Sequence, residues 1–303
     1  MLTNKPKVVV IGSINMDMVT RSSRFPQKGE TISGESFDQL PGGKGANQAV
    51  AAARLGAEVS MIGAVGDDHS GQALLKHLQD EQIDTSFVQI LQGQTTGMAQ
   101  ITVSEEDNQI IIVPGANFAL TKEHIDAAKD IIQSADIVVL QLEIPLEIVE
   151  HAAQIAAESA VKVILNPAPA PAERLNESLL QAVHYITPNE TELAHMTEQS
   201  NVELGIEDLL KEKVDAVVVT LGSEGVRFKQ KGDIVTGFVQ GRDVEVIDTT
   251  GAGDTFNGAL SYCLASGIEL AEAIEFANDA AGLSVTKFGA QTGMPTLTEV
   301  RKF

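Results

Sequence analysis

The chain has 303 residues, 43% of them hydrophobic, and its formal net charge at pH 7 is −21. This length and apolar content are sufficient for a large core in one or two domains. The strong negative charge argues against a nucleic-acid partner, because a phosphate backbone attracts basic surfaces.

The single cysteine and the N-terminus restrict the compartment. Cys263 has no second cysteine with which to form a disulfide, and its helical, apolar surroundings predict a core thiol rather than a reactive one. The N-terminus has no apolar signal-peptide region, and the longest apolar runs are too short to cross a bilayer. We therefore expect a cytoplasmic protein without a membrane partner.

Short branched apolar runs alternate with helical patterns along most of the chain. The runs are typical of strands buried on both faces and cover residues 8–11, 136–140, 161–165 and 216–220. The helical patterns cover residues 45–56, 70–82, 121–133, 145–159, 204–213 and 253–286. This order predicts an α/β fold with a doubly wound, mostly parallel sheet flanked by helices, in a single domain over residues 1–303.

Two stretches interrupt this alternation, at residues 15–40 and 94–114. Apolar and polar side chains alternate in both, and neither stretch contains a helical pattern. Residues 98–103 and 109–113 have the pattern of a hairpin that turns at residues 105–108. We expect these stretches to form a small discontinuous β-sheet, separate from the main one.

A glycine-rich turn stands where the last helical region begins. Gly251, Ala252 and Gly253 allow the free amides of a first helical turn to approach an anion closely, and the helix dipole favours the same charge. Asp254 is then positioned to accept a proton from a group that attacks a bound phosphate. The alternative is a plain turn before a capped helix.

Several polar residues have the chemistry of a polyol site, which needs carboxylates and amides in a rigid frame. Asn15 and Asp17 follow the first strand, where doubly wound sheets place ligands, although Asp17 alone is also typical of a turn. Glu143 follows residues 138–142 in the same way. Lys44 serves either sugar hydroxyls or phosphate, and its surroundings do not match a P-loop.

Three further signals can each be explained by local structure alone. Asn189 and Glu192 have the spacing of a capping box. Residues 220–225 fit either a nucleotide loop or a tight hairpin into the next run. Asn278 lies in the last helical region, where a lone asparagine usually faces solvent.

Four segments together resemble the motif series of the PfkB-type carbohydrate kinases, within these the branch that phosphorylates ribose. They are residues 12–17 (GSINMD), 42–49 (GGKGANQA), 189–192 (NETE) and 251–254 (GAGD), and the resemblance extends from about residue 8 to residue 295. It implies ATP-dependent phosphorylation of D-ribose at the 5-hydroxyl, with magnesium. It also implies that the small sheet is a lid over the sugar, often shared in a homodimer. The alternatives are kinases of 2-deoxyribose, fructose or adenosine and, in another class, a non-catalytic sugar or nucleotide sensor.

The resemblance also implies roles for individual residues. Asp254 is the base, and the amides from Gly251 to Asp254 receive the phosphoryl group. The residues implied to contact the sugar are Asn15, Asp17, Gly43, Asn47 and Glu143. Those implied on the nucleotide and magnesium side are Asn189, Glu192, Thr220, Gly222, Gly225 and Asn278.

A monovalent-cation site for potassium is the last implication of the resemblance. It carries over to Asp248, Thr250, Ser284, Lys287 and Gly289, the last three through their carbonyls. Gly293 departs from the pattern, because many relatives have serine there. The alternative is that Asp248 only caps its turn.

Overall fold

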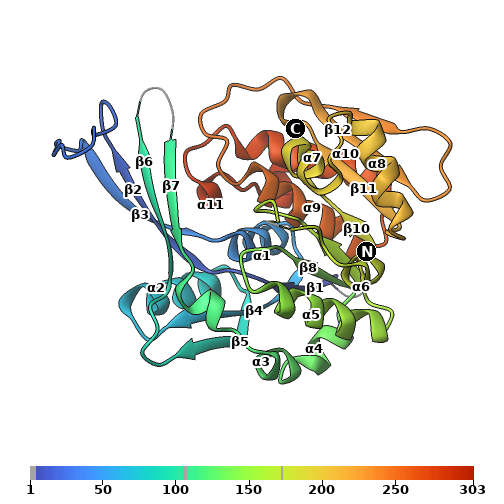
Figure 1. Ribbon diagram of the computed structural model, residues 1–303, viewed down its shortest axis with the longest axis horizontal. Helices are drawn as coiled ribbons and strands as arrows, with labels where there is room; N and C mark the ends of the chain where they lie inside the picture. The colour runs from blue at the N-terminus through green and yellow to red at the C-terminus, as the bar shows by residue number, and fades with distance from the viewer. Residues whose placement is uncertain (1–4, 105–107, 172) are drawn as a thin grey trace.

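The computed structural model describes residues 5–104, 108–171 and 173–303, and within these ranges the strands form two separate sheets (Figure 1). Most of the hairpin turn expected at residues 105–108 lies outside the described residues. The fold is the expected α/β class, with a large, mostly parallel sheet between helices and a smaller separate sheet.

The large sheet has nine strands, of which only the last two, β12 and β13, are antiparallel to their neighbours. In spatial order they are β13 (Gly237–Gln240), β12 (Gly225–Gln230), β11 (Ala216–Thr220), β10 (Tyr185–Ile186), β9 (Lys162–Leu165), β8 (Ile137–Leu140), β1 (Lys7–Ile11), β4 (Glu58–Gly66) and β5 (Asp84–Leu91). Predicted strands β1, β8, β9 and β11 are confirmed within one residue at each end. Strands β4, β5, β10 and β13 were not predicted from the sequence.

Helices cover both faces of this sheet, because successive strand side chains point to opposite sides. In β1, Val8 and Val10 contribute to one core and Val9 and Ile11 to the other. The first core is covered by α1 (Lys44–Arg54), α2 (His69–Asp80), α9 (Ala252–Ala265), α10 (Leu270–Ser284) and α12 (Leu297–Val300). The second is covered by η1 (Gly115–Ala119), α3 (Lys122–Asp126), α4 (Lys129–Gln133), α5 (Leu146–Glu158), α6 (Glu177–Ala182), α7 (Glu190–Thr197) and α8 (Val202–Lys211).

Two of the expected helical regions are divided in the structure. Residues 121–133 form α3 and α4 rather than one helix. Residues 253–286 form α9 and α10, which are separated at Gly267, a glycine with φ of 78° that ends the first helix in a left-handed turn. Cys263 is buried in α9, as expected, and burial raises the pKa of its thiol to about 12.

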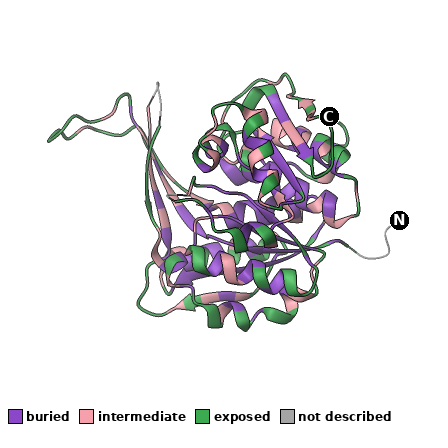
Figure 2. Cartoon of the chain, turned by 45° about the vertical axis from the view of Figure 1, so that its right-hand side comes forward, coloured by how far each residue is buried: buried purple, intermediate pink, exposed green. Residues whose placement is uncertain are grey.

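The small sheet consists of β3 (Ser36–Gly42), β2 (Asn15–Arg21), β6 (Gly97–Val103) and β7 (Asn108–Val113), in that spatial order. All four come from the two stretches expected to form it. The sheet projects from the main body and much of it is exposed (Figure 2). Its base adjoins α11 (Ala290–Gly293), which contacts β3. Across the described part of the chain, no helix is long and apolar enough to cross a bilayer.

Candidate active site

The site lies where the two sheets meet, beyond the carboxyl ends of β1 and β8 and at the N-termini of α1 and α9. β1 is followed directly by β2, so Asn15 and Asp17 lie at the base of the small sheet. Gly43 is the N-cap of α1, with φ of 89°, and Lys44 and Asn47 lie in the first turn of that helix. The fold therefore brings the start of α1 to the start of α9, where Asn47 and Asp254 are 207 positions apart in the sequence.

Asp254 is held by two neighbouring amides of α1. Asn47 Nδ2 donates to its Oδ2 at 2.8 Å, and Gln48 Nε2 donates to its Oδ1 at 3.0 Å. Gln48 is fully buried and accepts a hydrogen bond from Gln141 Nε2 at 2.7 Å. Each carboxylate oxygen keeps a lone pair beyond its amide partner, so Asp254 is fixed in position and still able to accept a proton.

A cluster of carboxylates surrounds one lysine at this point. Burial and the charges of Glu143 and Asp254 raise the pKa of Asp17 to about 7. Burial lowers the pKa of Lys44, but Asp254, Glu143 and Glu192 together outweigh it, so that the pKa lies above its ordinary value. The ammonium therefore stays charged and partly compensates the cluster.

Three further hydrogen bonds hold the sugar-side residues that the sequence predicted. Glu143 Oε2 accepts from Ser13 Oγ at 2.5 Å and from the Lys44 amide at 3.1 Å. Asn15 Oδ1 accepts from Asn117 Nδ2 at 2.7 Å. Both side chains are therefore held by hydrogen bonds from other parts of the chain.

The turn from residue 248 to residue 252 separates two cavities. One, of about 180 Å³, lies beneath the small sheet and is lined by Asp17, Asp248 and Thr250. The other, of about 410 Å³, lies on the opposite side and is lined by Thr249 and Ala252. A group bound in either cavity therefore lies against the same turn at the start of α9.

Gly251 is the N-cap of α9, with φ of 79°. A Cβ at this position would lie 2.8 Å from Ala290 Cβ, so the turn needs glycine both for its backbone conformation and for close packing. The amides at this helix start, including those of Gly253 and Asp254, are oriented to receive an anion.

The larger of these two cavities contains part of the predicted nucleotide set. Gly222 and Asn278 line it together with Gln240 and Arg242. Residues 220–225 do form the tight hairpin between β11 and β12, through the 3-10 turn η2 (Gly222–Glu224), so both interpretations of this segment remain compatible with the structure.

Asn278 differs from the expectation for a lone helical asparagine. It is buried and donates from Nδ2 to the Gln240 carbonyl at 3.0 Å, because β13 packs on α10 at this point.

The capping box at α7 is present in the structure. Asn189 Oδ1 accepts from the Glu192 amide and Glu192 Oε2 accepts from the Asn189 amide, both at 2.8 Å. Burial raises the pKa of Glu192 despite this bond and the charge of Lys44. Among the described residues, no group of three His, Cys, Asp or Glu side chains has the geometry of a metal site.

Asp248 joins the two segments for which a cation site was predicted, although its contact with Gly289 is to the amide and not to a carbonyl. Asp248 Oδ1 accepts from the Thr250 amide and hydroxyl at 2.9 and 2.6 Å, and its Oδ2 accepts from the Gly289 amide at 2.8 Å. Although burial raises the pKa of Asp248, these bonds and the charge of Arg21 lower it overall. The bonds to Thr250 are also those of the alternative interpretation, in which Asp248 caps its turn.

Two further positions of the predicted cation loop have contacts of their own. The Lys287 side chain donates from Nζ to Glu299 Oε1 at 3.3 Å. A Cβ at Gly293 would lie 2.2 Å from the Ser284 carbonyl oxygen, so a serine there requires a shift of this backbone.

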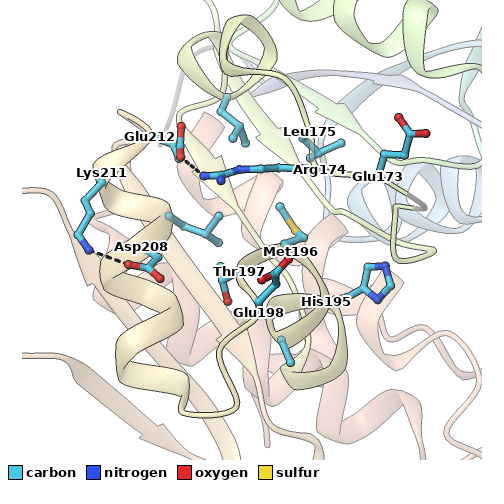
Figure 3. Close-up of a pocket in the computed structure, with 13 residues that line it drawn as sticks. Glu173, Arg174, Leu175, His195, Met196, Thr197, Glu198, Asp208, Lys211 and Glu212 are labelled. Carbon is cyan, nitrogen blue, oxygen red and sulfur yellow. Dashed lines mark hydrogen bonds and ion pairs between the residues drawn. The ribbon is translucent and has the colours of Figure 1, made fainter.

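A larger cavity, of about 680 Å³, lies elsewhere, between α6, α7 and α8 (Figure 3). Its charged lining is largely paired, since Arg174 contacts Glu212 and Lys211 contacts Asp208 at 2.7 Å. It contains none of the predicted site residues, and we assign no function to it.

A family model described as pfkB family carbohydrate kinase matches residues 5–297. The chain belongs to this family. It is 45% identical to a ribokinase of Lactococcus lactis subsp. lactis (strain IL1403), over 97% of this chain and 96% of that protein. A deoxyribokinase of Salmonella typhi is 33% identical, over 98% of each.

Among solved structures, an Arabidopsis thaliana ribokinase complexed with ribose and ATP superimposes with a TM-score of 0.93. It is 34% identical, and the match covers 99% of this chain and 98% of that one. The fold and motif series of this pfkB-family chain are thus those of ribokinases along nearly its whole length.

Sequence reasoning missed the residues that support the site from behind. Gln48, Gln141, Asn117 and Gln291 are buried amides whose partners are 93 to 244 residues away. Gln48 lies inside the GGKGANQA segment, which was the only signal in the sequence that pointed to any of them.

Proposed function

We propose that the protein is an ATP-dependent ribokinase that converts D-ribose to D-ribose 5-phosphate. The observation that carries this proposal is the position of the 248–252 turn between two cavities, with Asp254 fixed beside it. A sugar beneath the small sheet and a nucleotide on the other side would bring their reacting groups to one helix N-terminus. The greater similarity to ribokinase than to deoxyribokinase favours ribose as the sugar.

In this mechanism Asp254 accepts the proton of the 5-hydroxyl while that oxygen attacks the terminal phosphorus of ATP. The bond between that phosphorus and the ADP oxygen breaks, and the amides at the start of α9 stabilise the charge on the transferring group. Asn15, Asp17, Gly43, Asn47 and Glu143 hold the sugar. The small sheet acts as a lid that excludes water, the competing acceptor.

On the nucleotide side, we assign Asn189, Glu192 and Lys44 to the phosphates and their magnesium. We assign Thr220, Gly222, Gly225 and Asn278 to the rest of ATP. Magnesium, when bound, neutralises charge on the phosphates. Potassium in the loop of Asp248, Thr250, Ser284, Lys287 and Gly289 would fix the turn that presents the amides.

We also propose that the protein is cytoplasmic and forms a homodimer through the small sheet. β7 is an edge strand, and Ile110, Ile111, Ile112 and Val113 on it are between 42% and 68% exposed. A row of apolar side chains on an open edge is typical of a surface that pairs with another chain.

The test is Asp254→Asn, assayed for turnover and for binding of ribose and ATP. A positioned base is worth about 10²–10⁴ in rate, and we expect a loss of that size with both ligands still bound. The melting temperature is measured in parallel, because an asparagine offers only one acceptor to the amides of Asn47 and Gln48. Turnover close to the wild type would refute Asp254 as the base.

A panel of sugars with ATP tests the substrate. Ribose is expected to give the highest kcat/KM among ribose, 2-deoxyribose, fructose and adenosine. A preference for 2-deoxyribose would favour the deoxyribokinase alternative. No ADP formation with any of them would favour a non-catalytic sensor.

A further inference from the structure

Gln291 is a buried amide in α11 whose side-chain groups are both engaged. It is 4% exposed, its Nε2 donates to Asn47 Oδ1 at 2.8 Å, and its Oε1 lies 2.7 Å from His77 Nε2. Its backbone carbonyl accepts from Arg54. Since Nε2 donates to Asn47, Oε1 is the acceptor for the N–H of His77, and the orientation of the Gln291 amide is fixed from both ends.

The orientation of Gln291 determines that of Asn47. An asparagine amide has one oxygen and one NH₂ group, and Gln291 occupies the oxygen of Asn47 as an acceptor. The NH₂ group is therefore directed to the other side, where it donates to Asp254 Oδ2 at 2.8 Å. The Asp254 carboxylate favours the same orientation, because it accepts from the NH₂ group, and the donor of Gln291 opposes the reversed orientation from the other end of the Asn47 amide.

The segment that contains Gln291 also contacts Asp248 and the turn at the start of α9. The Gly289 amide donates to Asp248 Oδ2 at 2.8 Å. Ala290 packs against Gly251, the N-cap of α9. Three consecutive residues thus contact the predicted cation loop, the anion-receiving turn and, through Asn47, the predicted base.

We infer that Gln291 is a positioning residue for phosphoryl transfer, which holds Asp254 in place by orienting the Asn47 amide. Gln291 thereby links the conformation of the loop at residues 284–289 to the position of the Asp254 carboxylate. This inference rests on the proposed function, since it takes Asp254 as the base. Gln291 itself does not touch the reacting groups.

The test begins with Gln291→Glu, which keeps the shape and retains an acceptor for His77 but removes the donor to Asn47. The two carboxylates then compete for the single NH₂ group of Asn47, and we expect its hydrogen bond to Asp254 to be weakened or lost. Because a misplaced catalytic group costs up to about 10²-fold, we expect kcat to fall by about 10- to 100-fold, with the KM for ATP within about twofold of the wild type.

Gln79→Glu is the matched control. Gln79 is exposed on α2, two residues from His77, and donates only to Thr85 Oγ1 at 3.1 Å. The chemical change is the same, and we expect kcat to stay within about twofold of the wild type because surface changes of this kind have small effects.

A double-mutant cycle with Asn47→Ala separates positioning from a general loss of structure. Gln291→Ala is expected to lower kcat in the wild-type background but not in the Asn47→Ala background, since its effect passes through Asn47. All rates are referred to the folded fraction, measured by circular dichroism at the assay temperature. A fall in kcat with an unchanged KM for ATP is a second readout, because general destabilisation would not change kcat per folded molecule.

Two results would overturn the inference: a folded Gln291→Glu enzyme with wild-type kcat, or equal effects of Gln291→Ala in both backgrounds. Its failure is distinct from failure of the proposed function. If Asp254→Asn is inactive while the Gln291 variants are not impaired, only the role of Gln291 is wrong. If Asp254→Asn is active, the assignment of the base is wrong.

Discussion

Asp17→Asn should stabilise the ligand-free protein, and more so at high pH. Burial, Glu143 and Asp254 raise the pKa of Asp17 from 3.8 to about 7. The native state therefore holds this proton more tightly than the unfolded chain does, and unfolding releases it between those two values. The free energy of unfolding of the wild type consequently falls as pH rises through this window and stays low above pH 7.

The magnitude follows from the width of the window. One pKa unit corresponds to about 1.4 kcal/mol, and two units of the window lie above pH 5. Asparagine does not titrate, so between pH 5 and pH 8 the free energy of unfolding of the variant should gain on that of the wild type by about 3 kcal/mol. Partial solvation of the site makes this an upper value.

The assay is urea unfolding of both proteins at the two pH values, without ligands. Asp38→Asn, on the neighbouring strand β3, is the control for removing a charge outside the cluster, and its difference from the wild type should not change with pH. A difference between wild type and Asp17→Asn that is equal at pH 5 and pH 8, or that shrinks as pH rises, would refute the electrostatic interpretation of the cluster.

Three further predictions concern the turn, the nucleotide cavity and the cation. Gly251→Ala should lower both stability and kcat, because the added Cβ requires φ of 79° and would lie 2.8 Å from Ala290. The control is Gly267→Ala, where φ is 78° and no atom lies within 4 Å of the added Cβ. It should lower the free energy of unfolding by only about 1–2 kcal/mol and leave kcat unchanged. Asn278→Ala should raise the KM for ATP with little change in the KM for ribose, and equal increases in steady-state assays would contradict its assignment to the nucleotide. Replacing potassium by tetramethylammonium at constant ionic strength should lower the initial rate, and an unchanged rate would show that the cation loop has no role in this protein.

The sequence predicted the parts of the site that local chemistry specifies. The glycines at 251 and 253, the capping box at Asn189 and Glu192, and the polar residues after buried strands all leave a pattern within a few positions. The separate small sheet was equally visible, because alternation with a period of two differs from the surrounding helical pattern.

The supporting contacts were not predictable in this way. The bond between Gln291 and Asn47 joins residues 244 positions apart, and a buried glutamine in sequence looks the same as an exposed one. The usual solvent-facing position of a lone helical asparagine does not hold for Asn278, since its partner is a carbonyl of β13, a strand that was not predicted. Tertiary contacts decided these positions, and they override local preference.

The charges around Asp254 indicate how the phosphorylated sugar would be released. The sugar side carries Asp17, Glu143 and Asp254 around Lys44, an excess of carboxylates that suits a neutral polyol because its hydroxyls donate to them. The nucleotide phosphates are better accommodated across the 248–252 turn, at the start of α9. After transfer, a phosphate would lie next to the same carboxylates, and like charges in a partly buried site repel strongly. Burial, and after it the repulsion by Glu143 and Asp254, raises the pKa of Asp17. The same repulsion would favour release of the phosphorylated sugar, and Asp17→Asn should bind ribose 5-phosphate more tightly relative to ribose than the wild type does.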